Sequence, residues 1–198
     1  MARGQGQTGR APILTLLQYE QVENSIQPRP FRERDRSILA VSFYLGLRAK
    51  EIASLKIEDV YAADGSARSV VHIKRSYTKK NRMRDVYVSA PNLRTALERY
   101  WVNVRSSRPD SPLFPTRSGR HFTPNGMVHL FRDVYMQAGI KASSHSGRRT
   151  LITRLAEQGV DLKAIATLAG HSSISTTCIY IENNPERLSK IMSQVAIV

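Results

Sequence analysis

The stretch HSGRRTLITRLAEQGVDLKAIATLAGHSSISTTCIY, residues 145–180, decides the fold of this chain. A glycine commonly ends a helix, and an aspartate before an apolar run commonly caps the start of one. On these signals the stretch predicts three short helices in succession: about His145–Gln158 before Gly159, a second with Asp161 as N-cap that ends at Gly170, and a third over Ser173–Tyr180. The same stretch holds two histidines, an arginine and a tyrosine that are candidates for chemistry.

The residues that precede this stretch predict more helices. Thr15 has the spacing of a capping box for a short helix. Residues 33–45 are apolar on nearly every helical face, which is typical of a buried helix. Gly46 breaks that helix, and a short helix through residues 51–55 follows.

Between these helical regions the hydrophobic period changes. Residues 69–75 and 84–88 are rich in β-branched side chains and alternate in polarity, so they predict a small antiparallel pair of strands. Amphipathic helices are expected over residues 93–104 and 124–138, and a last helix after Asn184-Pro185. The predicted fold class is therefore mainly α with a small antiparallel β-sheet.

The length of 198 residues suits one hydrophobic core and is too short for two full-sized domains. We expect residues 1–12 to form a flexible basic tail and residues 13–184 to form one domain. Residues 185–198 are expected to form a C-terminal helix or tail. The apolar side of that helix could dock on its own domain or on a neighbouring subunit.

The charge of the chain indicates a polyanionic partner. Thirty Lys and Arg residues against sixteen Asp and Glu residues give a net charge of +14 at pH 7. Phosphate contacts release condensed counterions, so a nucleic acid is the simplest partner for such a surface. There is no apolar run long enough for a membrane span and no apolar leader, and the single cysteine, Cys178, fits a reducing cytoplasm.

Several common sites for phosphate chemistry are absent from the sequence. It contains no GxxxxGK[ST] loop, no HExxH, no cysteine cluster and no evident group of converging carboxylates. If the protein breaks phosphodiester bonds, we expect it to use side-chain nucleophiles and cations, with no metal or other cofactor.

Four short motifs carry the candidate chemistry. Arg48 lies in GLRAKE, His145 and Arg148 lie in HSGRRT, His171 lies in LAGHSS, and Tyr180 follows His171 by nine residues. Each motif alone is a weak signal. Their joint order and spacing resemble the tyrosine recombinase (phage integrase) family, which shares its catalytic core with type IB topoisomerases, and the resemblance runs from about Leu14 to Leu188.

The resemblance implies a nucleophile, a phosphate clamp and a general acid. Tyr180 would form a 3′-phosphotyrosyl link and release a 5′-hydroxyl, which preserves the phosphodiester energy without ATP. Arg48 and Arg148 match the two arginines that would hold the non-bridging oxygens. Lys79 aligns with the family's β-hairpin lysine, a general acid toward the leaving 5′-oxygen, with Lys80 and Lys74 as the other candidates.

The resemblance also assigns supporting roles. His145 and His171 match the two histidines that would hydrogen-bond the phosphate and assist proton movement at Tyr180. Glu51 matches an acidic position that would orient His145 or Arg148 without reacting. DNA contacts are expected from Lys74, Arg75, Lys80, Arg82 and Arg149. The basic residues around the hairpin, Arg84 among them, are expected to contact phosphate independently of the DNA sequence.

Two departures from the family pattern are visible. Gly147 stands where the family often has leucine, which we expect to loosen the start of the helix, and Arg149 stands where it often has a second histidine. Only about thirteen residues precede the first expected helix of the catalytic domain. The chain would therefore be either a minimal recombinase, similar in size to the fimbrial-switch invertases, or a fragment that lacks a core-binding domain.

The implied function is site-specific DNA recombination, with integration, excision or inversion as outcomes. The alternatives are a relaxation enzyme of the type IB topoisomerase kind and a non-catalytic DNA-binding accessory protein of the same fold. Expected partners are double-stranded DNA, further copies of the chain (dimer to tetramer) and accessory DNA-bending proteins. The expected location is the cytoplasm, at the nucleoid, with a bacterial, phage or mobile-element origin.

Overall fold

The computed structural model describes residues 10–78, 83–180, 189 and 192–193. Within them the chain is mainly helical with one two-stranded antiparallel sheet, as the sequence predicted. The elements in chain order are α1 (Leu16–Ile26), α2 (Arg32–Tyr44), α3 (Ala49–Ser54), α4 (Ile57–Val60), β1 (Val70–Ile73), the 3-10 turn η1 (Arg75–Tyr77), β2 (Arg84–Tyr87), α5 (Pro91–Val104), α6 (Pro124–Gln137), α7 (Ser146–Glu157), α8 (Leu162–Ala169) and α9 (Ile174–Cys178).

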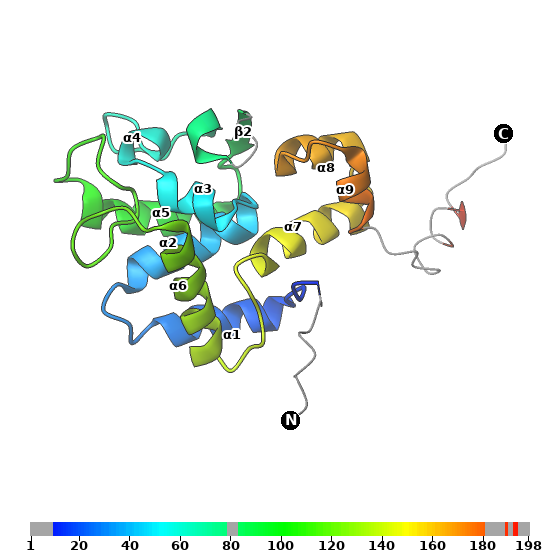
Figure 1. Ribbon diagram of the computed structural model, residues 1–198, viewed down its shortest axis with the longest axis horizontal. Helices are drawn as coiled ribbons and strands as arrows, with labels where there is room; N and C mark the ends of the chain where they lie inside the picture. Colours follow the sequence, from blue (N-terminus) through cyan, green and yellow to red (C-terminus); the bar gives the residue numbers. More distant parts are fainter. Residues whose placement is uncertain (1–9, 79–82, 181–188, 190–191, 194–198) are drawn as a thin grey trace, which may run out of the picture.

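Helix α2 is the centre of the main body of the molecule (Figure 1). Nine of its 13 residues are buried, which confirms the prediction of a buried helix. It packs against α1, α3, α5 and α7, while α6 packs against α1 and α3. One large apolar cluster runs through this body and includes the fully buried side chains of Leu39, Phe114 and Tyr135.

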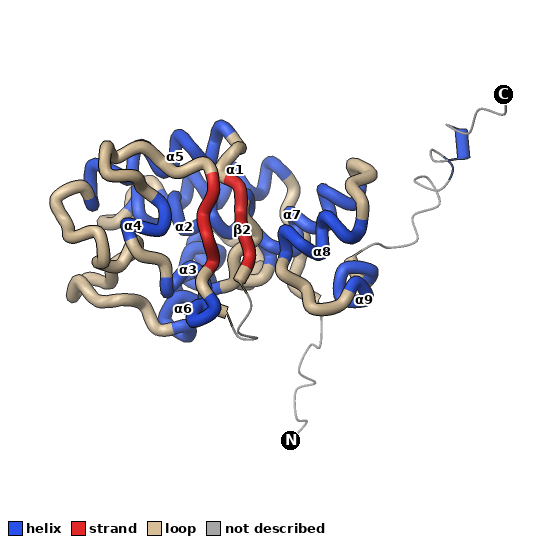
Figure 2. The backbone as a smooth tube through the Cα atoms, turned by 90° about the horizontal axis from the view of Figure 1, so that it is seen from above, coloured by secondary structure: helices blue, strands red, loops and turns tan. Residues whose placement is uncertain are grey.

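The two strands form the predicted hairpin, with Val70 opposite Tyr87 and Ile73 opposite Arg84. Val71, Ile73 and Val86 face the core and alternate with exposed residues. Strand β2 lies beside α8, so the end of the sheet reaches the C-terminal helices (Figure 2). The turn η1 was not predicted, and the rest of the connection, residues 79–82, is outside the described residues.

The last three helices lie at one side of the body and have a small core of their own (Figure 1). Helix α7 packs against both α2 and α8, and so joins the two parts. The small core consists of Ile152, Ala156, Ile165 and Ala169, and the ring of Tyr180 packs against it. All three helices of residues 145–180 are present, within a few residues of their predicted ends. The helix expected after Pro185 falls mostly outside the described residues.

The start of the described chain contacts these C-terminal helices. The backbone N–H of Leu14 donates to the Thr150 hydroxyl at 2.9 Å, and Arg10 donates to the Ile179 carbonyl at 3.2 Å. The predicted capping box at Thr15 forms, since its hydroxyl accepts from the Gln18 backbone and the Gln18 side chain accepts from the Thr15 N–H. Residues 1–9 of the expected tail lie outside the described part.

Helix α4 and the packing of residues 105–123 had no clear signal in the sequence. Lys56 pairs with Pro112 in an isolated β-bridge, and Leu113 and Phe114 are buried beside Tyr100. The segment is held by contacts distant in sequence, which local periodicity cannot indicate. Of the helices in the described residues, not one has the length and apolar character needed to cross a membrane.

Gly147 allows α7 to approach α2 closely, instead of loosening the start of α7 as we had expected. A Cβ at this position would lie 2.4 Å from the Ser42 hydroxyl oxygen, 2.8 Å from a ring carbon of Phe43 and 3.0 Å from the Ser42 backbone carbon. A larger residue therefore has to push α7 away from the centre of the body.

We expect Gly147→Ala to lower the free energy of unfolding by about 1–3 kcal/mol through overpacking, although alanine is the better helix former. Urea denaturation measures this change. Gly126→Ala in α6 is the matched control, because its new Cβ would meet side-chain atoms alone, the nearest being the Thr123 hydroxyl oxygen at 3.1 Å. Equal or greater stability of the Gly147→Ala variant would contradict the close approach.

Candidate active site

Arg48 is placed by a sharp turn between two helices. Gly46 adopts φ +61° at the end of α2, and Arg48 is the N-cap of α3. A left-handed φ favours glycine, so the GLR sequence fits this turn. The Arg48 guanidinium donates to Glu51 at 3.0 Å and makes a longer contact of 3.4 Å with the Gly170 carbonyl. Its side chain is 34% exposed, so it remains accessible from solvent.

Arg148 reaches the same place from α7 and is almost completely buried. Its guanidinium donates to the carbonyls of Gly46 at 2.8 Å and Ala169 at 2.5 Å. Burial, reinforced by the charges of Arg48 and Arg84, lowers the pKa of Arg148 to about 9, so the group is still charged at neutral pH. Two of the predicted site residues, 100 positions apart in sequence, are thus brought together.

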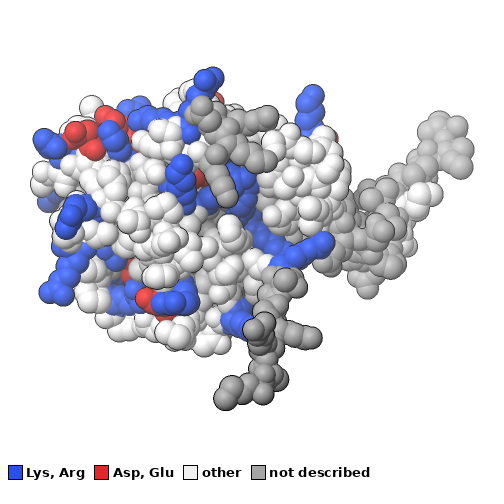
Figure 3. Space-filling model, viewed as in Figure 1, with Lys and Arg blue, Asp and Glu red and all other residues white. Residues whose placement is uncertain are grey.

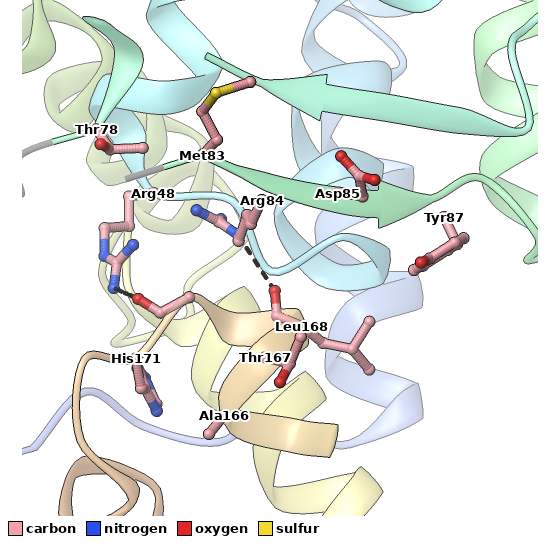
Figure 4. A pocket seen from close by; sticks show the side chains of 11 residues that line it. Arg48, Thr78, Met83, Arg84, Asp85, Tyr87, Ala166, Thr167, Leu168 and His171 are labelled. Atoms are coloured by element: carbon pink, nitrogen blue, oxygen red, sulfur yellow. Dashed lines mark hydrogen bonds between the residues drawn. The ribbon is translucent and has the colours of Figure 1, made fainter. Parts of the chain in front are cut away.

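The C-terminal end of α8 gathers three arginines. The consecutive carbonyls of Leu168, Ala169 and Gly170, here called the carbonyl triplet, accept from Arg84, Arg148 and Arg48 respectively. The last carbonyls of a helix have no partner within the helix and carry the negative end of its dipole. Arginine side chains therefore pair with the unpaired oxygens and complement the local field; Figure 4 shows the contacts of Arg48 and Arg84.

Glu51 binds two arginines, and this differs from the expected role. We expected it to orient His145 or Arg148, but its carboxylate, 1% exposed, pairs with Arg48 and Arg84. Burial alone would raise the pKa of Glu51. The hydrogen bonds and charge of Arg84, with those of Arg48, outweigh that effect and hold the pKa below its ordinary value.

This shift predicts a pH dependence of stability. A carboxyl with a lowered folded-state pKa stabilises the fold above its unfolded pKa and loses that contribution as pH falls through the folded value. We expect Glu51→Gln to lower the free energy of unfolding by about 3 kcal/mol at pH 7, because it leaves buried guanidinium groups without a counter-charge. The difference from the wild type should shrink in acid, where Glu51 is also neutral.

Urea denaturation of both proteins from pH 7 down to pH 3 measures this effect. Glu58→Gln is the control, since Glu58 is 42% exposed and its contact with Lys74 is 3.7 Å long. An exposed pair of this kind contributes about 0–1 kcal/mol. A wild-type advantage that did not shrink in acid would contradict the assigned ionisation of Glu51.

The predicted histidines and the tyrosine lie next to this arginine cluster. The His171 Nδ1 is 2.9 Å from the buried Thr177 hydroxyl, and its ring stacks on that of Tyr180 with centroids 5.8 Å apart. His145 is the N-cap of α7, three residues before Arg148. Burial and the charges of Arg148 and Arg48 lower the pKa of His145, which favours the neutral form of its ring.

The remaining predicted site residues are not part of the arginine cluster or lie outside the described residues. Lys79, Lys80 and Arg82 lie outside the described residues. Lys74 forms an ion pair of 2.6 Å with Asp59, which raises its pKa, while Arg75 is exposed on η1. The guanidinium of Arg149 donates to the Ala11 carbonyl at 2.7 Å.

Arg84 is the site residue that sequence reasoning misplaced. We grouped it with the basic residues expected to contact phosphate, yet its side chain is only 7% exposed and binds Glu51 through both terminal nitrogens, at 2.8 Å each. A hint was present in the alternation of β2, which places Arg84 and Val86 on the same face. The direction of its side chain depends on α8, which is distant in sequence.

A cavity of about 610 Å³ opens between β2 and α8 and is lined by Arg48, Arg84, His171 and Gly170 among others (Figure 4). Basic side chains also lie along the hollow between the main body and the C-terminal helices (Figure 3). Within the cluster, Glu51 offsets only part of the charge of Arg48, Arg84 and Arg148. The excess positive charge suits a phosphate group, with a phenol and two imidazoles beside it. Among the described residues there is no cluster of His, Cys, Asp and Glu that could hold a metal.

Comparisons with known proteins agree with this geometry. The family model described as "Phage integrase family" matches residues 12–187. Tyrosine recombinase XerA of Thermococcus kodakarensis is 29% identical over 171 residues, which are 85% of this chain and 58% of the relative. Tyrosine recombinase XerD of Pseudomonas putida is 32% identical over 168 residues, which are 82% of this chain and 54% of the relative. The chain thus spans somewhat more than half the length of these relatives.

Solved structures share the fold. A crystal structure of XerA recombinase matches 98% of this chain and 66% of its own, with a TM-score of 0.74 and 24% identity. The XerH site-specific recombinase, bound to its palindromic difH substrate in a post-cleavage complex, matches 95% of this chain and 54% of its own with a TM-score of 0.73 and 23% identity. At this identity the likeness concerns the fold.

Proposed function

The chain belongs to the phage integrase family of tyrosine recombinases, and on that premise we propose that it cleaves and rejoins DNA strands at specific sites through a covalent link to Tyr180. The observation that carries the proposal is the position of the Tyr180 ring. It stacks on His171, which directly follows Gly170, and the Gly170 carbonyl accepts from Arg48, so the proposed nucleophile and the proposed phosphate clamp lie in one cluster of one chain.

In the proposed cleavage step the phenolic oxygen of Tyr180 attacks the phosphorus of the scissile phosphate. The bond from phosphorus to Tyr180 forms as the bond to the 5′-oxygen breaks, which gives a 3′-phosphotyrosyl link and a 5′-hydroxyl. The phenolic proton passes to an imidazole of the site, for which His145 and His171 are the candidates. Rejoining is the reverse, with a 5′-hydroxyl as nucleophile, so the phosphodiester energy is conserved.

Charge on the phosphate in the transition state would be met by Arg48 and Arg148. Both guanidinium groups are oriented before substrate arrives, by the carbonyl triplet and by Glu51 and Gly46. Such preorganised donors stabilise developing charge without further rearrangement. We propose Lys79 as the acid that protonates the leaving 5′-oxygen. Its support is its alignment with the family's hairpin lysine and the position of the ends of the hairpin, at Thr78 and Met83, on the rim of the cavity.

Double-stranded DNA is the proposed substrate. Its support is the net charge of +14 and the complexes of related recombinases with DNA. The proposed contacts with the phosphates of the DNA backbone are Lys74, Arg75, Lys80, Arg82 and Arg149. Exchange between two duplexes breaks four strands, and each break uses one Tyr180, so we propose that up to four copies assemble on DNA during recombination.

Trapping of the covalent intermediate tests the proposal. Fragmented bacterial genomic DNA is incubated with the protein, the reaction is stopped with detergent, and the ends bound to protein are sequenced to find the preferred site. A nicked duplex that carries this site is then used to accumulate the intermediate. We expect peptide mass spectrometry to place the DNA on Tyr180, and the released strand to accept label from polynucleotide kinase without prior dephosphorylation.

Other outcomes would overturn the proposal in defined ways. DNA binding with no adduct at any trapped site would indicate a non-catalytic DNA-binding protein. An adduct with relaxation of supercoiled plasmid, but no exchange between two marked duplexes, would indicate a topoisomerase. An adduct at the 5′ end would exclude the polarity stated above.

A further inference from the structure

Arg84 joins three elements that are separate in the sequence. It lies at the start of β2, its Nε donates to the Leu168 carbonyl of α8 at 3.2 Å, and its two terminal nitrogens hold Glu51 of α3. Figure 4 shows the side chain between the hairpin and α8. Residues 79–82 come just before β2 in the chain. Arg84 therefore joins β2 to the arginine cluster.

The contacts of Arg84 are arranged so that Glu51 has a fixed orientation. Each of its terminal nitrogens pairs with a different carboxylate oxygen at 2.8 Å, the planar two-point contact that arginine makes with carboxylates. The same two oxygens accept from Arg48, one from its guanidinium at 3.0 Å and the other from its backbone N–H at 2.8 Å. Arg84 thus helps to hold Arg48 in place through the Glu51 carboxylate, which is 1% exposed.

Gly170 provides the room for this arrangement. A Cβ there would lie 2.8 Å from Cδ and 3.0 Å from Nη1 of Arg84, and the residue adopts φ +63°. The glycine before His171 therefore allows the Arg84 side chain to pass directly against the end of α8. The close approach ties the cluster to the residue that stacks on Tyr180.

From these contacts we propose that Arg84 is a positioning residue for the cleavage reaction, which acts through Glu51 to hold Arg48 against the scissile phosphate. The inference rests on the proposed function of the site. An indirect role fits Arg84 because its side chain is only 7% exposed and three of its five N–H donors already face Glu51 or Leu168. Replacement of Arg84 should therefore slow the chemical step and leave DNA affinity nearly unchanged.

The experiment compares Arg84→Gln and Arg84→Lys with the wild type, by the rate of adduct formation at saturating nicked DNA and by DNA affinity. Residues that orient metal ligands typically contribute about 10–100-fold to activity, and by analogy we expect a loss in this range for Arg84→Gln. The rate of adduct formation by Arg84→Lys should lie between those of the wild type and Arg84→Gln, because lysine keeps the charge but not the two-point contact. Arg68→Gln removes a positive charge from an exposed position just before β1 and should cleave at the wild-type rate.

A double-mutant cycle separates positioning from general support of the fold. If Arg84 acts through Glu51, the Arg84→Gln and Glu51→Gln double variant should lose little more rate than Glu51→Gln alone. If the fold-loss of the double variant equals the product of the two single fold-losses, the two residues act independently and the inference is overturned. Thermal unfolding identifies the temperature at which every variant is folded, and the rates are measured below it.

A modified substrate tests whether the effect passes through Arg48 or through the leaving-group acid. With sulfur in place of the bridging 5′-oxygen, the leaving thiolate needs no proton. We expect the loss in Arg84→Gln to persist on this substrate, since the phosphate clamp is still required. Disappearance of the loss would show that Arg84 acts on the hairpin acid, and would overturn the proposed route.

The two proposals can fail separately. If the wild type forms no adduct, the proposed function fails before Arg84 is tested. If Tyr180→Phe abolishes the adduct while Arg84→Gln cleaves at the wild-type rate, the function stands and the positioning role is wrong.

Discussion

Replacement of Tyr180 by phenylalanine is expected to abolish the covalent protein–DNA adduct and leave the fold intact. The substitution removes one oxygen, and the ring can still pack against the small C-terminal core and stack on His171. Loss of a nucleophile lowers the rate of covalent catalysis by more than about 10⁴-fold. Detergent gels with labelled nicked duplex measure adduct formation, and a filter assay measures binding, which we expect to change less than about twofold.

Tyr44→Phe is the matched control for this experiment. Tyr44 lies at the end of α2, where its hydroxyl accepts from Asn92 at 3.1 Å, and it should form adduct at the wild-type rate. Adduct that persisted in Tyr180→Phe would mean that another side chain is the nucleophile. The assignment of the whole cluster would then be wrong, because the roles proposed for His171 and Arg148 both assume that Tyr180 attacks the phosphate.

Much of the fold was predictable because its signals are local. Thr15 and Asp161 cap the start of a helix with their side chains, and Gly170, which has no side chain, ends one; the structure places helix ends at all three residues. The hairpin followed from a change of period to two. The fold class and the membership in the recombinase family follow from such signals and from the spacing of the motifs between Arg48 and Tyr180.

The hydrogen-bond partners within the cluster were not predictable, because they depend on contacts between elements that are distant in sequence. Glu51 was paired with the wrong partners, and Arg84 was taken for a phosphate contact. In each case the residue type and the general region were right. What decides the partner is the end of α8, where three carbonyls collect three arginines, and no local pattern reports which arginine reaches which carbonyl.

Gly147 shows a similar limit at the level of packing. Seen in the sequence alone, a glycine inside a helix indicates a weak helix. In the fold it permits the contact between α7 and Ser42 of α2, and that contact carries Arg148 toward Gly46. The departure from the family pattern therefore has a structural reason that appears only when both helices are present.

Replacement of Arg148 by lysine is expected to lower the rate of adduct formation by about 10²–10³-fold at saturating DNA. The guanidinium spans the carbonyls of Gly46 and Ala169, and in the proposed complex it also faces the phosphate. A lysine ammonium is a single point of charge and cannot keep this geometry. The fold should lose about 1–3 kcal/mol, because one buried carbonyl is left without a partner.

The substrate can show that the rate loss comes from the phosphate charge. A methylphosphonate at the scissile position removes the negative charge of one non-bridging oxygen, so the clamp has less charge to neutralise. The ratio of wild-type to Arg148→Lys rate should therefore be much smaller on this substrate than on the normal one. Arg154→Lys, an exposed position on the same helix, controls for the change of residue type. An equal ratio on both substrates would show that Arg148 serves the packing of α7 and α8 and does not bind the reacting phosphate.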